Sequence, residues 1–252
     1  MSAMKSLYSA LWVLLLATAS LAQTPEVVPI DNEPMHKLVF ENEYVRVFSV
    51  EVPPHSETKI HQHDRDYTFV VLGDSDVESV RVNEQPVHLQ LKDGESRWTK
   101  GGFAHRAKNL SDKPFRNITI ELKQDVGKME CGIAGLPECP GTMLSVSCPG
   151  AGHLNTARSV FKAEQLLVTR ETICPPRPRP ARADALLIAV KEITTADIRA
   201  AAGLAVSFPD GGVAKDVSGE FLFLKKDEPM IFPGEKKPRD VVVLSFGNCG
   251  CE

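Results

Sequence analysis

The chain has 252 residues, of which 42% are hydrophobic and 25% are charged, with a formal net charge of −4 at pH 7. That length allows one large domain or two domains of about 100 residues each. The mildly negative charge argues against a nucleic-acid partner, which would require a basic face, and is compatible with a small-molecule ligand.

The first 22 residues have the pattern of an export signal. Lys5 gives a short positive start, residues 7–18 are almost all apolar, and Ser20-Leu21-Ala22 places small residues before a cleavage site. The apolar run is short for a membrane span, although an uncleaved anchor is the alternative. We therefore expect a secreted or periplasmic protein that has no membrane association once the signal is removed.

Short strands separated by turns are predicted through the first half. Residues 37–40 and 44–52 are rich in Val, Phe and Tyr, residues 77–82 and 87–91 flank an Asn-Glu-Gln-Pro turn, and residues 117–122 alternate as in a half-buried strand. No segment of helical period of any length separates them. Short strands with frequent turns indicate a closed or double-sheet β architecture.

Three histidines in this half have the spacing of metal ligands. His61 and His63 are one residue apart, so on a strand their side chains share one face of the sheet. His105 would reach them from a later strand. Three imidazoles with open coordination positions suit a catalytic divalent transition metal, because a structural site is usually closed by four protein ligands. The alternative is a set of hydrogen-bonded histidines inside a barrel without metal.

The residues around these histidines resemble the two motifs of the cupin family. His61-Gln62-His63, followed by the apolar run 67–72, is similar to the first motif, Gly-x5-His-x-His-x3,4-Glu, with His55 in place of the Gly. The second motif, Gly-x5-Pro-x-Gly-x2-His-x3-Asn, is matched by Gly94, Gly102, His105 and Asn109, with Lys100 in place of Pro. The resemblance spans roughly residues 37–122, and two motifs at the right separation are more specific than either alone.

The resemblance implies a barrel with a metal in its mouth, held by His61, His63 and His105. The metal would be Fe, Mn, Zn, Ni or Cu. The family's fourth ligand is a Glu, and Tyr67 aligns with it here. Tyr67 and its neighbour Asp66 are therefore competing candidates for the fourth ligand or for a general acid–base group.

Other residues near the motifs have weaker interpretations. Asn109 is expected to orient groups by hydrogen bonding, and Trp98 to wall the pocket or to form part of the core. The remaining histidines are interpreted as ordinary polar residues: His36, His55, His88 and His153. Of these, only His55 is near enough in sequence to border the site.

All six cysteines follow the first barrel, at Cys131, Cys139, Cys148, Cys174, Cys249 and Cys251. In an exported protein an even number predicts disulfides. Residues 131–148 are rich in Gly and Pro, so disulfides from Cys249 and Cys251 to this loop would offset its weak core. The alternative is a thiolate metal or redox site at Cys249-Gly250-Cys251.

The second half is interpreted as a degenerate copy of the first. Residues 172–177 echo 50–55, residues 184–190 echo 66–72, Gly219-Glu220 echoes Gly94-Glu95, and residues 236–244 echo 112–120. An internal repeat of this size predicts two barrels rather than one. The one helix-like stretch is residues 195–202.

The copy lacks the histidines. Arg-Pro-Arg-Pro-Ala-Arg, at residues 177–182, stands in place of His-x-His, and Met230 stands at the position of His105. Only the first barrel is therefore expected to hold a metal. The three arginines are interpreted as an exposed loop, or alternatively as an anion site at the barrel mouth.

The predicted fold is all-β, with two tandem cupin-type double-stranded β-helix (jelly-roll) barrels. The predicted segments are a signal peptide at 1–22, an N-terminal barrel at 23–125, a Cys-, Gly- and Pro-rich linker at 126–155 and a degenerate barrel at 156–252. Three functions stay open: a metal-dependent enzyme of dioxygenase or isomerase type, a barrel that binds a sugar or other small ligand without turnover, and a structural protein that self-associates as a homo-oligomer.

Overall fold

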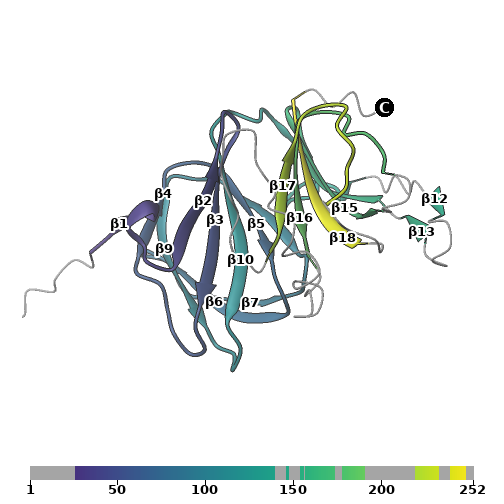
Figure 1. Cartoon of the computed structure of the whole chain (residues 1–252). Coiled ribbons are helices and arrows are strands. Elements are labelled where there is room, and N and C mark those ends of the chain that lie inside the picture. The colour runs from purple at the N-terminus through teal and green to yellow at the C-terminus, as the bar shows by residue number, and fades with distance from the viewer. Residues whose placement is uncertain are drawn as a thin grey trace, which may run out of the picture.

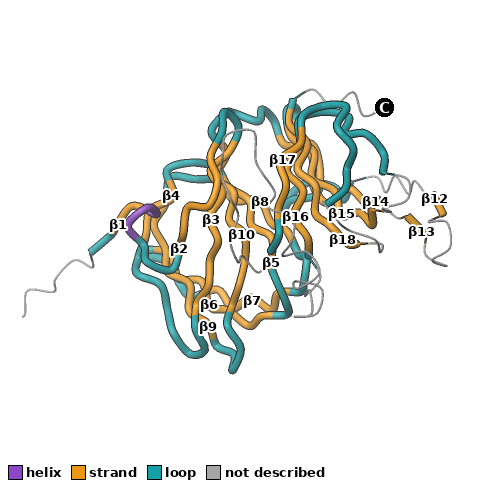
Figure 2. Tube along the Cα trace, in the orientation of Figure 1, coloured by secondary structure: helices purple, strands orange, loops and turns teal. Residues whose placement is uncertain are grey.

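The computed structural model describes residues 26–139, 146–147, 154–155, 157–173, 178–190, 219–232 and 239–247. Strands supply nearly all the regular structure of this part, with one 3-10 turn, η1 (Ile30–Asn32) (Figure 2). The all-β prediction is confirmed. The expected signal peptide and the helix-like stretch 195–202 lie outside the described residues. No helix in the described part is long and apolar enough to span a membrane.

The first half folds as two five-stranded sheets that face each other. Sheet 1 has the order β1–β4–β9–β6–β7, and its strands are β1 (Val28–Pro29), β4 (His61–His63), β9 (Phe103–Asn109), β6 (Ser75–Arg81) and β7 (Val87–Leu91). Sheet 2 has the order β2–β3–β10–β5–β8, and its strands are β2 (His36–Glu41), β3 (Val45–Val52), β10 (Phe115–Leu122), β5 (Tyr67–Val71) and β8 (Ser96–Thr99). Because the chain crosses to the other sheet after every strand except β2 and β6, the arrangement is a jelly roll.

An apolar core lies between sheets 1 and 2 and borders a cavity there. Its buried members are Ile30, Phe48, Val50, Val52, Val71, Val77, Leu91 and Phe115. The alternation predicted for residues 117–122 places Asn117, Thr119 and Glu121 on this inner face, and Ile118 and Ile120 on the outer face. Sheet 2 is therefore apolar on its outer side as well, which requires a second packing partner.

Sheet 3, in the second half, repeats sheet 2. Its order is β11–β14–β15–β18–β16–β17, and its strands are β11 (Met129–Cys131), β14 (Ala157–Ala163), β15 (Leu166–Ile173), β18 (Arg239–Phe246), β16 (Ala185–Ala189) and β17 (Phe221–Leu224). Apart from β11, this order matches sheet 2 strand for strand. A separate two-stranded pair joins β12 (Val146–Ser147) and β13 (Leu154–Asn155). β11 to β13 lie in the segment predicted as a linker.

The strand registers of sheet 3 match those of sheet 2, as an internal repeat predicts. In sheet 2, Val45 pairs with Leu122, and in sheet 3 Leu166 pairs with Phe246 at the same end. The edge bulge also recurs, between Leu38 and Phe40 in one sheet and between Ser159 and Phe161 in the other. The echo of residues 50–55 by 172–177 is wrong by one residue, because the register places Ile173, and not Cys174, at the position of Val52.

The same register extends to the strand that carries the histidines in the first copy. There Gln62 pairs with Ala104, and in the second copy Pro180 bridges Pro229. Counting one residue from these pairs gives the equivalents of the histidines, which are Arg179 for His61, Ala181 for His63 and Met230 for His105. The prediction that the second copy has lost these side chains is confirmed.

The two copies pack back to back through one core. The outer faces of sheets 2 and 3 contribute to a single buried cluster, and sheet 3 lies beside the N-terminal barrel (Figure 1). Tyr44 stacks on Phe246 with ring centroids 5.1 Å apart. At Gly219, whose φ is 122°, a Cβ would lie 2.5 Å from the side chain of Leu72, so this close approach requires glycine.

A disulfide joins Cys131 and Cys139 in the segment between the copies. Of the cysteines in residues 131–148, only Cys148 is then left for the expected tie to Cys249 or Cys251. These three residues and Cys174 lie outside the described residues, so that part of the disulfide prediction stays a prediction.

An ion pair lies in the second copy where the first has the histidine cluster. Glu171, which is 6% exposed, pairs with Arg179 and accepts a hydrogen bond from Thr169 Oγ1 at 2.7 Å. By register, Glu171 corresponds to Val50 and Arg179 corresponds to His61. Of the three arginines interpreted as an exposed loop, Arg182 is exposed, Arg179 is paired, and the third lies outside the described residues.

We expect Arg179→Met to lower the free energy of unfolding by about 2–3 kcal/mol, because the carboxylate of Glu171 would stay buried without its partner. Arg179→Met/Glu171→Val removes both charges and should recover most of that loss. Urea unfolding of the two variants and the wild type measures the difference. A single variant as stable as the wild type would show that the pair has no structural role.

Candidate metal centre

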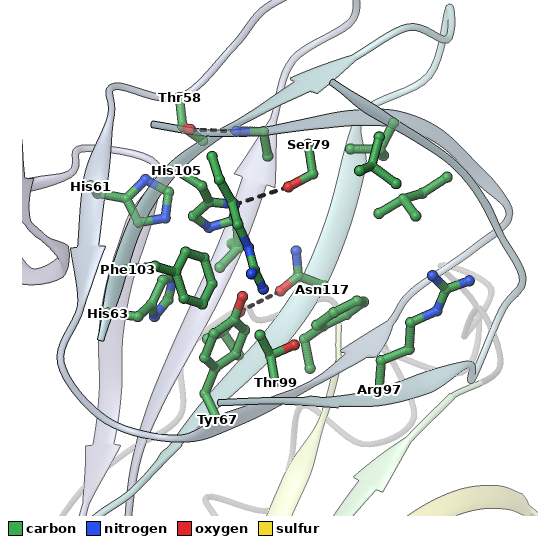
Figure 3. Close-up of a pocket in the computed structure, with 18 of the residues that line it drawn as sticks. Thr58, His61, His63, Tyr67, Ser79, Arg97, Thr99, Phe103, His105 and Asn117 are labelled. Carbon is green, nitrogen blue, oxygen red and sulfur yellow. Dashed lines mark hydrogen bonds between the residues drawn. The ribbon is translucent and has the colours of Figure 1, made fainter. Parts of the chain in front are cut away.

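Strands β4 and β9 bring the three predicted histidines together. His61 lies opposite His105, with ring centroids 4.7 Å apart, and the centroid of His63 is 5.0 Å from that of His61 and 5.3 Å from that of His105. His61 and His63 are fully buried. All three rings line one end of a cavity of about 330 Å³ between sheets 1 and 2 (Figure 3).

A fourth histidine, His36, joins this group from sheet 2. Its ring centroid lies 4.5 Å from that of His61 and 6.4 Å from that of His63. One ring nitrogen from each of His36, His61 and His63 lies within 4.8 Å of the others, and His105 is not part of this closely spaced group. The interpretation of His36 as an ordinary polar residue is therefore wrong. It stands outside both sequence motifs, and only the fold places it here.

Two other histidines behave as predicted. His55 pairs with Asp112 and His88 pairs with Asp76, and both imidazoles are more than half exposed. Neither lines the cavity. His153 lies outside the described residues.

Three imidazoles of the cluster make a hydrogen bond through Nδ1 to a group outside it, whereas Nδ1 of His63 lies near Glu121 but makes no hydrogen bond among the described residues. The pairs are His36 with Glu33 Oε2 at 2.7 Å, His61 with the Lys59 carbonyl at 2.9 Å, His63 with Glu121 Oε1 at 3.4 Å, and His105 with Ser79 Oγ at 3.1 Å. Such partners orient a ring and leave Nε2 for a metal. Nε2 of His61 is buried and has no hydrogen-bond partner in the described protein, which is costly unless something else binds it.

Burial also sets the charge of these rings. Desolvation lowers the pKa of His61 to about 3, lowers that of His63, and holds that of His105 well below its ordinary value. The neighbouring imidazoles add to the effect, since each disfavours charge on the others. At neutral pH the three rings are neutral, which is the form that binds a metal. The donor set and its electrostatics therefore fit a transition metal.

No protein-family model matches the chain, and no curated protein sequence does either. Among solved structures, a cupin domain from Bordetella pertussis Tohama I is 31% identical and matches over 35% of this chain and 92% of its own, with a TM-score of 0.34. The chain belongs to the cupin superfamily. This confirms the resemblance carried by the two histidine motifs.

Two further structures are similar over part of the chain. A conserved protein with a double-stranded β-helix domain from Klebsiella pneumoniae is 25% identical over 40% of this chain and 86% of its own, with a TM-score of 0.32. The polyketide cyclase RemF from Streptomyces resistomycificus is 17% identical over 38% of this chain and 72% of its own, with a TM-score of 0.30. Each of these matches spans less than half of the present cupin.

Of the two candidates for the cupin Glu position, the structure brings Tyr67 to the histidines. Its ring stacks on His63 with centroids 4.1 Å apart, and burial raises its pKa to about 12. It is therefore a neutral phenol that donates a hydrogen bond. β5 pairs with β10 without a register shift, so no bulge turns Asp66 inward. Asp66 instead accepts a hydrogen bond from the N–H of Gly101 at 2.8 Å and does not line the cavity.

Asn109 and Trp98 lie away from the cavity of this cupin. The Asn109 amide donates to the carbonyls of Val52 and Lys113, at 3.0 and 2.7 Å, so it ties loops together and does not orient a ligand. Trp98 packs against the core that the two copies share, so it is core and does not wall the pocket.

The rest of the cavity is mainly apolar. Its apolar walls come from Val50, Phe69, Val77, Leu89, Leu91 and Phe115. The Arg81 guanidinium lies over the ring of Phe103 at 4.0 Å, opposite His105 in the strand register. Arg97 lies at the other end of the cavity from the histidines (Figure 3). The site therefore combines a cluster of nitrogen donors, an apolar wall and two cationic side chains.

Proposed function

We propose that the N-terminal barrel binds one divalent transition metal through His61, His63 and His105 and acts on a small organic molecule, as a dioxygenase or an isomerase. The observation that carries this proposal is the orientation of the cluster. Nδ1 of His36, His61 and His105 each has a hydrogen-bond partner outside the cluster, and the buried Nε2 of His61 has none among the described residues, beside an open cavity. A metal bound there supplies Lewis acidity or redox chemistry to a substrate.

The remaining residues of the cavity bind and orient the substrate. A volume of about 330 Å³ lies within the range of small-molecule sites. The apolar walls hold the body of the substrate and exclude water, which strengthens electrostatic interactions inside. Tyr67 holds a proton beside His63 and acts as the general acid. The side chain of Arg81 favours a substrate with an anionic group near the histidines.

Turnover with metal tests this function. We expect metal-loaded protein to convert a member of a panel of 1,3-diketones, catechols and 2-hydroxy acids, to lose this activity with a chelator and to regain it on re-addition. Tyr67→Phe keeps the stacked ring and should lower kcat about 100-fold while metal content stays unchanged. Asp66→Asn is the matched control, because its side chain lies outside the cavity.

A barrel that binds a small ligand without turnover is the second candidate. The observation that favours it is Tyr67 in the position of the cupin Glu, which removes a carboxylate from the site. Ligands that raise the Tm of the loaded protein and are recovered unchanged would support it. Equal activity of Tyr67→Phe and the wild type would overturn the role of the phenol as the acid.

We also propose that the protein works outside the cytoplasm. The pattern of residues 1–22 supports export, and so does the disulfide between Cys131 and Cys139, since disulfides persist in oxidising compartments.

A further inference from the structure

We infer that His36 is the fourth metal ligand, so that the centre is held by four imidazoles and no carboxylate. This inference rests on the proposed function, since it concerns the same metal. It departs from the motif of the family, in which the fourth ligand is a Glu close behind His-x-His. Here the fourth donor would come from a different strand and from the opposite sheet.

The position of His36 is the first argument. It opens β2, where it pairs with Val50, and its ring reaches across to the histidines of β4. A ring nitrogen of His36 lies within 4.8 Å of one from His61 and one from His63. A single ion placed between three such atoms can approach all of them. His36 also lines the same cavity as the other three histidines.

The second argument is the way His36 is held. Glu33 is 1% exposed, and its Oε2 accepts hydrogen bonds from His36 Nδ1 at 2.7 Å and from the N–H of Met35 at 2.8 Å. Its Oε1 accepts from the N–H of Lys59 at 3.2 Å, and the Lys59 carbonyl accepts from His61 Nδ1 at 2.9 Å. This buried carboxylate therefore fixes two imidazoles of the cluster together, in the tautomer that directs Nε2 inward.

The acidic groups near the cluster are already engaged, and Glu84, which also lines the cavity, is 58% exposed and lies 3.9 Å from Arg81 Nη1. Glu121 is buried and lies 3.4 Å from His63 Nδ1 and 3.0 Å from Arg46 Nη1, so it supports a ligand and does not face the ion. Glu33 is used by His36 in the same way. Tyr67 offers a neutral phenol, which is a poor ligand. Among the described residues, His36 is the side chain placed to take the position of the carboxylate.

The second copy supplies the third argument. By the register of β14 on β15, Ala157 occupies the position of His36, just as Arg179, Ala181 and Met230 occupy those of the other three histidines. The two copies therefore differ at all four positions together. Four imidazoles favour Zn, Cu, Ni or Fe over Mn, because the harder ion prefers carboxylate oxygen.

Zinc affinity and coordination number test the inference. Zn²⁺ binding to the purified full-length protein is measured by competition with a chromophoric chelator, and X-ray absorption counts the nitrogen ligands. His36→Gln keeps a donor for Glu33 but has no imidazole. We expect it to bind Zn²⁺ at least about 100-fold more weakly than the wild type, with one nitrogen fewer, since loss of an outer partner alone costs about 10–100-fold. Glu33→Gln should weaken binding about 10-fold with the nitrogen count unchanged.

The controls separate this inference from the proposed function. His88→Ala removes an exposed histidine and should bind as the wild type does. A wild type that binds no Zn²⁺ overturns the proposed function and this inference with it. A His36→Gln variant with wild-type affinity and an unchanged nitrogen count overturns the inference alone and leaves the site of three histidines. Circular dichroism of each variant confirms that it is folded, and His36→Ala replaces His36→Gln if the latter is not.

Discussion

Removing the metal from the wild-type protein is expected to lower its Tm by about 10 °C. A ligand that binds only the folded state stabilises it by about 2.7–4.1 kcal/mol at 100–1,000 times its Kd, and each kcal/mol shifts the Tm of a chain of this size by about 2–4 °C. His61→Ala/His63→Ala should contain almost no metal when purified from the exported fraction without added metal, whereas the wild type should be near stoichiometric. Elemental analysis and thermal unfolding with and without a chelator provide both readouts.

The comparison in chelator isolates the contribution of the metal. Nε2 of His61 is a buried polar atom that has no hydrogen-bond partner among the described residues, so replacing His61 removes an unfavourable group from the metal-free protein. The difference in Tm between the wild type and the double variant should therefore shrink strongly when the metal is removed. His88→Ala should behave as the wild type in both conditions. Absence of metal from the folded wild type would favour a metal-free binding barrel.

The three histidines of the motifs were predictable because their positions depend on local rules. His61 and His63 share a face by strand alternation, and His105 follows from the spacing of the second motif. His36 depends on how β2 pairs with β3 and on where sheet 2 meets sheet 1, and neither is encoded in a local pattern. The choice between Asp66 and Tyr67 required knowing that β5 pairs without a bulge, which only the strand register shows.

The strands likewise divide into those that a local sequence pattern predicts and those that depend on pairing with distant strands. β7 has the predicted bounds, and the other expected strands of the first barrel differ by one or two residues at their ends. β8 was not predicted, and β9 was expected only as a later strand carrying His105, without bounds, because charged residues interrupt the apolar pattern of both; pairing with β5 and with β4 and β6 stabilises them instead. In the second copy, residues 184–190 and the described residues 239–244 aligned correctly with the first. The echo of residues 50–55 slipped by one at residues 172–173, because matching prolines do not fix strand register.

Shortening a core side chain in either copy should destabilise both copies. Ile120 on β10 and Leu244 on β18 occupy equivalent positions, are fully buried and belong to one cluster. We expect Ile120→Ala and Leu244→Ala each to lower the free energy of unfolding by about 3–4 kcal/mol, which combines the lost burial with the cavity left behind. Urea unfolding followed by circular dichroism measures this loss.

The position of Trp98 distinguishes a shared core from two independent ones. It belongs to the first copy and packs against the shared cluster, and it is the one tryptophan after residue 22. With cooperative unfolding, Leu244→Ala in the second copy should shift the transition reported by Trp98 fluorescence as far as the transition reported by circular dichroism. Val87→Ala, at a side chain 53% exposed, should change stability by less than about 0.5 kcal/mol. Two separate transitions, of which Leu244→Ala moves only one, would show that the copies unfold independently and that the outer face of sheet 2 is stable without sheet 3.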